Sequence, residues 1–173
     1  MFFTNDEGGV FMKLVVILAW VLFTLNLPGP TLAAETEENA SVWIPDTVAE
    51  YADEYGTIMI VDIDNQHAYA CVDGDVIADT DCVTGDTYSS PTPTGLYNVW
   101  YKRSDFYMMD VYYSAYATFF NDGIAIHDAD AWRSEYGGTI YQGGGSHGCV
   151  NVPCWFAEIV YNNTDYGTPV YVY

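Results

Sequence analysis

Short runs of β-branched and aromatic residues, separated by turn residues, dominate the sequence from residue 57 onward. Residues 57–63 read TIMIVDI, residues 66–72 read QHAYACV and residues 76–83 read VIADTDCV. Such runs are typical of β-strands, and the Asp73-Gly74 pair predicts a two-residue hairpin turn between the second and the third. In that hairpin Cys71 would pair with a residue near Val76. The pattern predicts a mostly β chain, folded as an antiparallel β-sandwich or a barrel-like structure.

Further strands are expected downstream, at residues 123–127 (GIAIH) and in the closing TPVYVY. A loop rich in Thr, Ser and Pro spans residues 85–95 and leads into LYNVWY. Residues 102–118 hold many tyrosines in no clean period, so we expect a long loop there that acts as a mobile lid. A glycine-rich stretch at residues 137–145 precedes the sequence SHGCVNVP.

Two short helices are expected. The first would begin with Asp46 as its N-cap and end at Gly56. The second would begin near Pro153, because proline suits the first turn of a helix. Its apolar face would consist of Trp155, Phe156, Ile159 and Val160.

The charge is strongly one-sided, with 4 Lys+Arg against 24 Asp+Glu and a formal net charge of −20 over 173 residues. Half of the residues are apolar, which is too many for a disordered acidic segment and enough for one sizeable core. Affinity for a phosphate backbone comes from Lys and Arg, so nucleic acid is excluded as a partner. An anionic membrane surface is disfavoured for the same reason.

Residues 14–27 form an apolar run that is too short for a membrane span, which needs roughly 18 residues. Lys13 precedes the run, a Pro-Gly pair breaks it, and small residues end at Ala34. We therefore expect a secretory signal peptide at residues 1–34, with an uncleaved anchor as the alternative. Translation is expected to start at Met12, because the first eleven residues carry acidic but no basic residues. The predicted organisation continues with a linker and short helix at 35–55 and one domain at 56–173, working outside the cytoplasm.

Cys149 is the residue with the clearest chemical context. His147 lies two residues before it and His127 lies 22 residues before it. A cysteine nucleophile acts as its thiolate, and an imidazole is a suitable base to form one. Gly148 would leave nearby N–H groups free to face an oxyanion, and the field of the helix after Pro153 would favour the thiolate.

Other interpretations of these residues stay open on chemistry alone. A lone cysteine is usually a small core residue, and His127, His147 and Cys149 are of types that bind zinc. The four cysteines of an exported chain could also form disulfides, with Cys71–Cys82 as one candidate pair.

An ordered series of motifs resembles the catalytic domain of L,D-transpeptidases, the YkuD-type fold. The series consists of VDIDNQHAYACVDGDVIADTDCVTG, the TPTG at residues 92–95, GIAIHDADAWR, YGGTIY, GSHGCVNVP and the closing GTPVYVY. Together these motifs span about residues 56 to 173. The resemblance implies a YkuD-type β-sandwich with one or two short helices.

The resemblance also implies roles for the site residues. Cys149 matches the nucleophile and His127 the general base, while Asp128 matches a position that orients the base. The backbone N–H groups near Cys149 match the oxyanion hole. The residues that match positions lining the site or contacting the substrate are Ser146, His147, Gly148 and Asn151, with Trp132 and Arg133 as further substrate contacts. The segment HDADAWR is one residue longer than the family pattern, which implies altered substrate contacts. Cys82 fits family usage as an unpaired thiol, and Cys154 is expected to pack in the helix.

What the resemblance implies in function is an exported cysteine acyltransferase that cross-links peptidoglycan stem peptides and releases D-alanine. It implies no cofactor and no metal, a monomer, and covalent inhibition by carbapenems. An L,D-carboxypeptidase using the same acyl-enzyme and a catalytically silent wall-binding module are the alternatives. Lys102, Arg103 and Arg133 flank the expected cleft loops and are candidate contacts for substrate carboxylates.

Overall fold

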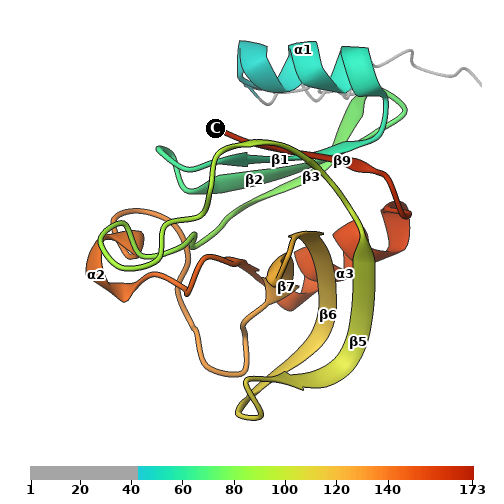
Figure 1. Ribbon diagram of the computed structural model, residues 1–173. Helices are drawn as coiled ribbons and strands as arrows, with labels where there is room; N and C mark the ends of the chain where they lie inside the picture. The colour runs from blue at the N-terminus through green and yellow to red at the C-terminus, as the bar shows by residue number, and fades with distance from the viewer. Residues whose placement is uncertain (1–42) are drawn as a thin grey trace, which may run out of the picture. The chain divides into compact units, whose positions relative to one another are not determined.

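The computed structural model describes residues 43–173 (Figure 1). Within this range the chain forms three helices and nine strands. The helices are α1 (Asp46–Tyr55), α2 (Tyr141–Gly144) and α3 (Cys154–Asn163). The strands are β1 (Ile58–Asp62), β2 (His67–Val72), β3 (Asp75–Asp81), β4 (Gly95–Asn98), β5 (Tyr101–Met108), β6 (Tyr112–Asn121), β7 (Ile124–Asp128), β8 (Val150–Val152) and β9 (Pro169–Val172). The predicted mostly β, two-sheet fold is confirmed, with one helix more than expected.

One sheet has five strands in the order β3-β2-β1-β9-β4. The predicted hairpin joins β2 and β3, and Cys71 pairs with Val76 across it, as the Asp73-Gly74 turn indicated. The expectation of a purely antiparallel sheet is wrong, because β9 lies parallel to β1 in the middle of the sheet. The parallel pair joins the two ends of the domain, a pairing that local turn residues do not specify.

The second sheet has four strands in the order β5-β6-β7-β8, and its last two strands are also parallel. The long loop expected at residues 102–118 is wrong: this segment forms most of the β5–β6 hairpin. Most residues of β5 are exposed, so neither face of this strand carries the alternating apolar pattern that reveals a strand in a sequence. The paired strands form the long curved hairpin in Figure 1.

Strand β1 is buried on both faces because it separates two apolar clusters. Met59 and Val61 face the main core, which lies between the two sheets and includes Phe156 and Val160 of α3. The alternate residues, Ile58 and Ile60, face a smaller cluster under α1. Helices α1 and α3 therefore both pack against sheets, whereas the four-residue α2 buries no side chain.

Both longer helices differ in detail from their prediction. Asp46 is the first residue of α1 rather than its cap, because Pro45 holds the preceding position; the helix ends at Gly56 as predicted, with a positive φ of 69°. Trp155 was expected on the buried face of α3 but is 50% exposed. The buried residues of α3 are Phe156, Ala157 and Val160.

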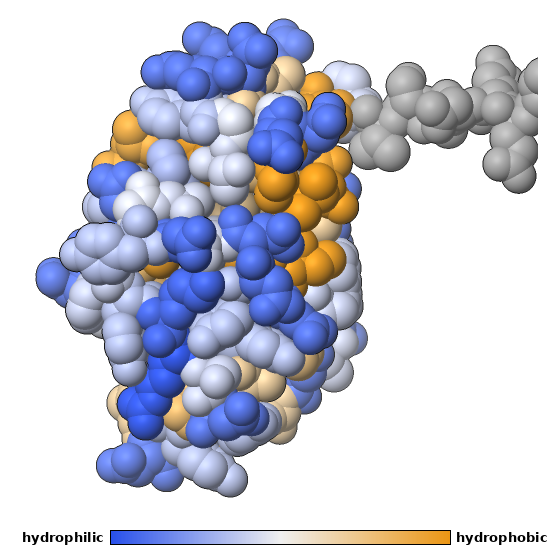
Figure 2. All heavy atoms as spheres, turned by 90° about the vertical axis from the view of Figure 1, so that its right-hand side faces the viewer, coloured by the Kyte–Doolittle hydropathy of each residue, from blue (hydrophilic) through white to orange (hydrophobic). Residues whose placement is uncertain are grey.

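The four cysteines are all free thiols, so the Cys71–Cys82 disulfide is not formed. Cys71 and Cys82 are buried in the two clusters, and Cys154 is half-buried at the start of α3. The predicted signal peptide, the start at Met12 and the acidic linker lie outside the described residues. Among residues 43–173 the structure contains no helix long and apolar enough to cross a membrane. The face in Figure 2 is largely hydrophilic, with apolar residues in smaller patches.

Candidate active site

A row of paired residues crosses the four-stranded sheet and carries the candidate site. Arg103 of β5 pairs with Ala117, Ala117 pairs with His127, and His127 pairs with Asn151 of β8. Directly paired residues point to the same face of a sheet, and alternate residues along a strand share a face. Cys149 lies two residues before Asn151, so its side chain emerges on the face that carries His127.

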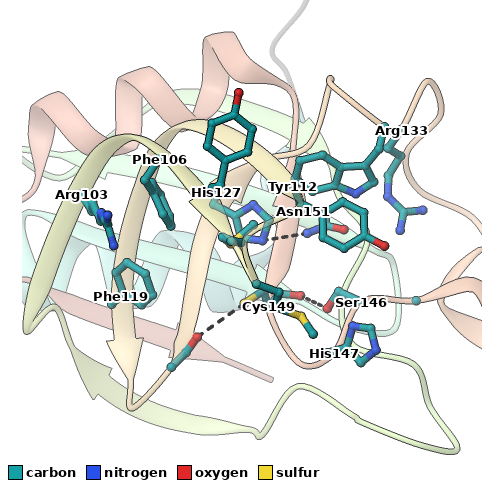
Figure 3. A pocket seen from close by; sticks show the side chains of 16 residues that line it. Arg103, Phe106, Tyr112, Phe119, His127, Arg133, Ser146, His147, Cys149 and Asn151 are labelled. Carbon is teal, nitrogen blue, oxygen red and sulfur yellow. Dashed lines mark hydrogen bonds between the residues drawn. The ribbon is translucent and has the colours of Figure 1, made fainter.

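The side chains of Arg103, His127, Cys149 and Asn151 line a pocket of about 490 Å³ (Figure 3). The β5–β6 hairpin supplies one wall of this pocket through Arg103, Phe106, Tyr107, Met108, Met109, Tyr112 and Phe119. The segments around β7 and β8 supply the opposite wall through Gly123, His127, Trp132, Arg133, Gly145, Ser146, His147, Cys149 and Asn151. The structure thus brings the predicted residues together with aromatic residues of the hairpin.

His127 is buried and held at both ring nitrogens. Its Nδ1 lies 2.8 Å from the backbone carbonyl oxygen of Asp128. A carbonyl only accepts, so Nδ1 carries the proton and Nε2 has a free lone pair. Asn151 Nδ2 donates to that Nε2 at 3.0 Å. Burial lowers the pKa of His127 below its ordinary value, so the ring is a neutral base at neutral pH.

Asp128 orients the base through its backbone and not through its side chain. Its carboxylate accepts hydrogen bonds from the Ser114 hydroxyl and the Tyr116 N–H, both at 2.8 Å. The side chain therefore fixes β7 to β6 on the side away from the pocket. Asn151 is buried, and its amide is bonded to the imidazole; the expected contact with a substrate carboxylate stays a prediction.

Cys149 is half-buried, and its Sγ lies 3.7 Å from the Gly123 carbonyl oxygen. Burial raises the pKa of the thiol, and a backbone hydrogen bond from Ala125 offsets only part of that effect. The expected help from the field of α3 stays a prediction; strand β8 separates Cys149 from α3 in the sequence. The first amide of α3, at Cys154, instead donates to Asp130 Oδ2 at 2.8 Å. These pKa shifts favour a protonated thiol and a neutral imidazole, and the two groups line the same pocket.

A network of hydrogen bonds shapes the loop before Cys149. Gly148 adopts a φ of +110°, which favours glycine, and its N–H donates to Ser146 Oγ at 3.0 Å. Ser146 Oγ in turn donates to the Cys149 carbonyl oxygen at 2.5 Å. The Gly148 N–H is therefore already used. Among the described residues, the N–H groups of His147 and Cys149 have no protein acceptor and can face an oxyanion.

Thr92, from the TPTG segment, stabilises this loop through hydrogen bonds. Its buried hydroxyl accepts a hydrogen bond from the Gly85 N–H and donates to the Gly148 carbonyl oxygen, both at 2.8 Å. Gly85 has no room for a side chain, since an added Cβ would lie 2.9 Å from the Gly148 Cα. Gly85 and Thr92, which are far from the Cys149 loop in the sequence, thus stabilise one conformation of that loop.

The remaining predicted residues form the rim. Trp132 lies with its ring centroid 6.0 Å from that of His127 and 5.0 Å from that of Tyr112. His147 is exposed and lies near Ser146 in Figure 3. Arg133 Nη2 donates to the Gly144 carbonyl oxygen at 3.2 Å. Within residues 43–173 no three His, Cys, Asp or Glu side chains converge in a way that could hold a metal ion.

A family model of the L,D-transpeptidase catalytic domain, YkuD, matches residues 56–172. This chain belongs to the L,D-transpeptidase family. The match covers every strand of the structure and all the residues that line the pocket. No curated protein sequence matches the chain.

Solved structures of L,D-transpeptidases have the same fold. The crystal structure of a cysteine-to-serine mutant of the Enterococcus faecium L,D-transpeptidase is 35% identical, with a TM-score of 0.62 over 68% of this chain and 50% of that one. The NMR structure of the catalytic domain from E. faecium is also 35% identical, with a TM-score of 0.61 over 69% of this chain and 98% of that one. The ertapenem-acylated form of that domain is 35% identical, with a TM-score of 0.59 over 68% of this chain and 97% of that one. This chain therefore spans about half the length of the crystallised E. faecium protein.

The aromatic residues that the β5–β6 hairpin adds to the pocket of this L,D-transpeptidase could not be predicted from the sequence. Phe106, Tyr112 and Phe119 lie within or beside the segment that was expected to be a loop. Asp105 has a φ of +51°, which interrupts the alternation along β5 and places Phe106 beside Arg103. No periodic signal in the sequence reveals such a strand.

Proposed function

We propose that this L,D-transpeptidase is an exported cysteine acyltransferase that joins peptidoglycan stem peptides through a thioester on Cys149. The observation that carries the proposal is the pairing of a half-buried thiol with a buried neutral imidazole in one pocket. The tautomer of His127 is fixed by the Asp128 carbonyl, so Nε2 is the basic nitrogen. Membership of the L,D-transpeptidase family supports peptidoglycan stem peptides as the substrate class.

In the first half-reaction, Nε2 of His127 takes the thiol proton as Sγ attacks the carbonyl carbon of the third residue of a donor tetrapeptide. The thiol at rest contacts Gly123, and Asn151 occupies Nε2. Both contacts must therefore give way as substrate enters. The N–H groups of His147 and Cys149 would hold the oxyanion, since the Gly148 N–H is engaged by Ser146. The imidazolium then returns its proton to the departing D-alanine amine, leaving the thioester.

In the second half-reaction, the side-chain amine of an acceptor stem attacks the thioester carbonyl. Neutral His127 accepts a proton from that amine, an amide bond forms, and the proton returns to the thiolate of Cys149. Water in place of the amine gives an L,D-carboxypeptidase. The aromatic wall that the β5–β6 hairpin supplies favours an organic acceptor over bulk water.

Carbapenems are proposed as covalent inhibitors of Cys149. The catalytic domain from E. faecium, 35% identical to this chain, has been solved in a form acylated by ertapenem. We expect ertapenem to acylate Cys149 and not Cys154, although Cys154 is also half-buried. The Cys154 amide is tied to Asp130, outside the pocket, so no oxyanion donors converge there. Peptide mapping after acylation identifies the modified residue.

Incubation of the purified protein with a disaccharide tetrapeptide, followed by mass spectrometry of the products, tests the proposal. A cross-linked dimer with loss of D-alanine is the expected result. Loss of D-alanine without dimer would indicate the carboxypeptidase, and unchanged substrate would indicate a wall-binding module. Export is tested separately, by locating the protein in cell fractions and sequencing its mature N-terminus, expected to follow Ala34.

A further inference from the structure

Positive charge is scarce in this protein, and two of its cations lie in the pocket. Only four Lys and Arg residues occur in the chain, against 24 acidic residues. Three of them, Lys102, Arg103 and Arg133, fall within the described residues. Arg103 and Arg133 line the pocket, whereas Lys102 does not. Within residues 43–173 neither arginine forms an ion pair with a carboxylate.

Arg133 is held at one end of the pocket by a single neutral contact. Its Nη2 donates to the Gly144 carbonyl oxygen at 3.2 Å, and among the described residues its buried Nε has no acceptor. Burial lowers the pKa of this guanidinium, and the nearby Tyr136 offsets only part of that effect. A buried N–H without an acceptor is costly, and an incoming carboxylate would accept from Nε and Nη together.

Arg103 lies at the other end of the pocket, on the edge strand β5. It occupies the same row as His127, two strands away, which places the two Cα atoms about 10 Å apart. Its guanidinium carbon lies 4.7 Å from the centre of the Phe106 ring, and Phe119 also lines this end of the pocket. Figure 3 shows Arg103 and Arg133 on opposite sides of Cys149.

We infer that Arg103 and Arg133 are two separate carboxylate-binding subsites, so that this cleft selects stem peptides with free carboxylates on both sides of the scissile bond. The inference rests on the proposed function and narrows its substrate class. One arginine binds the carboxylate on the leaving D-alanine. The other binds a carboxylate on the acyl side of the scissile bond. If Arg103 is the acyl-side residue, Phe106 and Phe119 would pack against the aliphatic chain of the substrate.

The local environment explains why such subsites are needed here. A net charge of −20 repels peptide carboxylates at a distance, so their binding requires positive charge inside the cleft. Arginine is suited to this role because its planar fork donates two parallel hydrogen bonds to one carboxylate. Separate subsites would bind two carboxylates without bringing them together.

The test uses four soluble tetrapeptides, in which the D-alanine carboxylate and the acyl-side carboxylates are free or amidated in every combination. Wild type, Arg103→Gln and Arg133→Gln are compared by the kcat/KM for release of the fourth residue, as D-alanine or as D-alaninamide. Lys102→Gln is the matched control, because it removes the same charge one residue away from Arg103. Lys102 Nζ instead donates to the Thr164 carbonyl oxygen and lies 4.5 Å from the Tyr161 ring centre, outside the pocket.

Each arginine variant is expected to lower kcat/KM for the fully free peptide by about tenfold to a hundredfold. Amidation of one carboxylate should abolish the effect of one variant, and amidation of the other carboxylate the effect of the second. Lys102→Gln should leave all four values within about twofold. The inference is overturned if neither effect depends on amidation, or if both variants respond to the same carboxylate. Absence of turnover by wild type on every peptide would overturn the proposed function instead.

Discussion

At the scale of single residues, the site depends on how a thiol and an imidazole are kept neutral. Burial raises the pKa of Cys149 and lowers that of His127, so an ion pair between them is not the resting state. Catalysis then requires transfer of the proton as the substrate is attacked. Activity should be lost as pH falls through the pKa of His127, which lies below its ordinary value of 6.5.

Asn151 offers a direct test of that pH dependence. Its amide donates to His127 Nε2, and Asn151→Asp would place a carboxylate there that stabilises the imidazolium. We expect the acid limb of the kcat/KM profile to move to higher pH by about one unit or more. Asn151→Ala removes the hydrogen bond without adding charge and serves as the control. An acid limb that stays in place in Asn151→Asp would show that His127 is not the base.

At the scale of elements, the Cys149 loop is held by Thr92, which lies 56 residues before Gly148 in the sequence. Thr92→Val keeps the shape of the side chain but leaves the Gly85 N–H and the Gly148 carbonyl unpaired in the interior. We expect a loss of about 2–4 kcal/mol in the free energy of unfolding, measured by urea denaturation. Thr94→Val is the control, because Thr94 is exposed in the same segment. Equal effects of the two variants would contradict the stabilising role.

Helix α3 allows a second test with neighbouring residues. Phe156 is fully buried in the main core, whereas Trp155 is 50% exposed. Phe156→Ala should cost about 3–5 kcal/mol of unfolding free energy through the cavity it leaves. Trp155→Ala should cost less than about 1 kcal/mol. Urea denaturation compares the two, and a reversed order would mean that α3 is rotated from its described position.

The elements that could be predicted from the sequence are those with local signals. The Asp73-Gly74 turn specifies its own hairpin, and Gly56 ends α1 because it adopts a positive φ. The parallel neighbours β1 and β9 lie more than a hundred residues apart, and no local signal pairs them. Strand β5 could not be predicted because most of its residues are exposed. The wall that this strand contributes to the pocket could therefore not be predicted either.

In the candidate site, too, residues within motifs could be predicted, whereas contacts that depend on the fold could not. Motifs identified Cys149 and His127, because their spacing matches a family pattern. The hydrogen bond between Asn151 and His127 depends on the parallel register of β7 and β8, which no motif states. The use of the Gly148 N–H by Ser146 depends on a loop conformation that likewise appears only in three dimensions.

At the scale of the whole molecule, the net charge of −20 opposes folding through repulsion among carboxylates. Within the described residues the carboxylates form ion pairs only with His67. Added salt therefore screens repulsion among carboxylates far more than it screens attraction between opposite charges. The thermal midpoint should rise by several degrees as sodium chloride increases from about 10 to 300 mM, over which the Debye length falls below about 10 Å. Circular dichroism measures the midpoint, and a fall with salt would contradict this explanation.

The central claim is that Cys149 carries the acyl group of a donor stem. The most direct measurement is the intact mass of the protein, quenched with acid after mixing with a tetrapeptide donor and no acceptor. Wild type should gain the mass of the donor minus D-alanine, with the adduct mapped to Cys149. Cys149→Ala should gain nothing, and His127→Ala should acylate at least about a hundredfold more slowly. An adduct of the same size on Cys149→Ala would contradict the account.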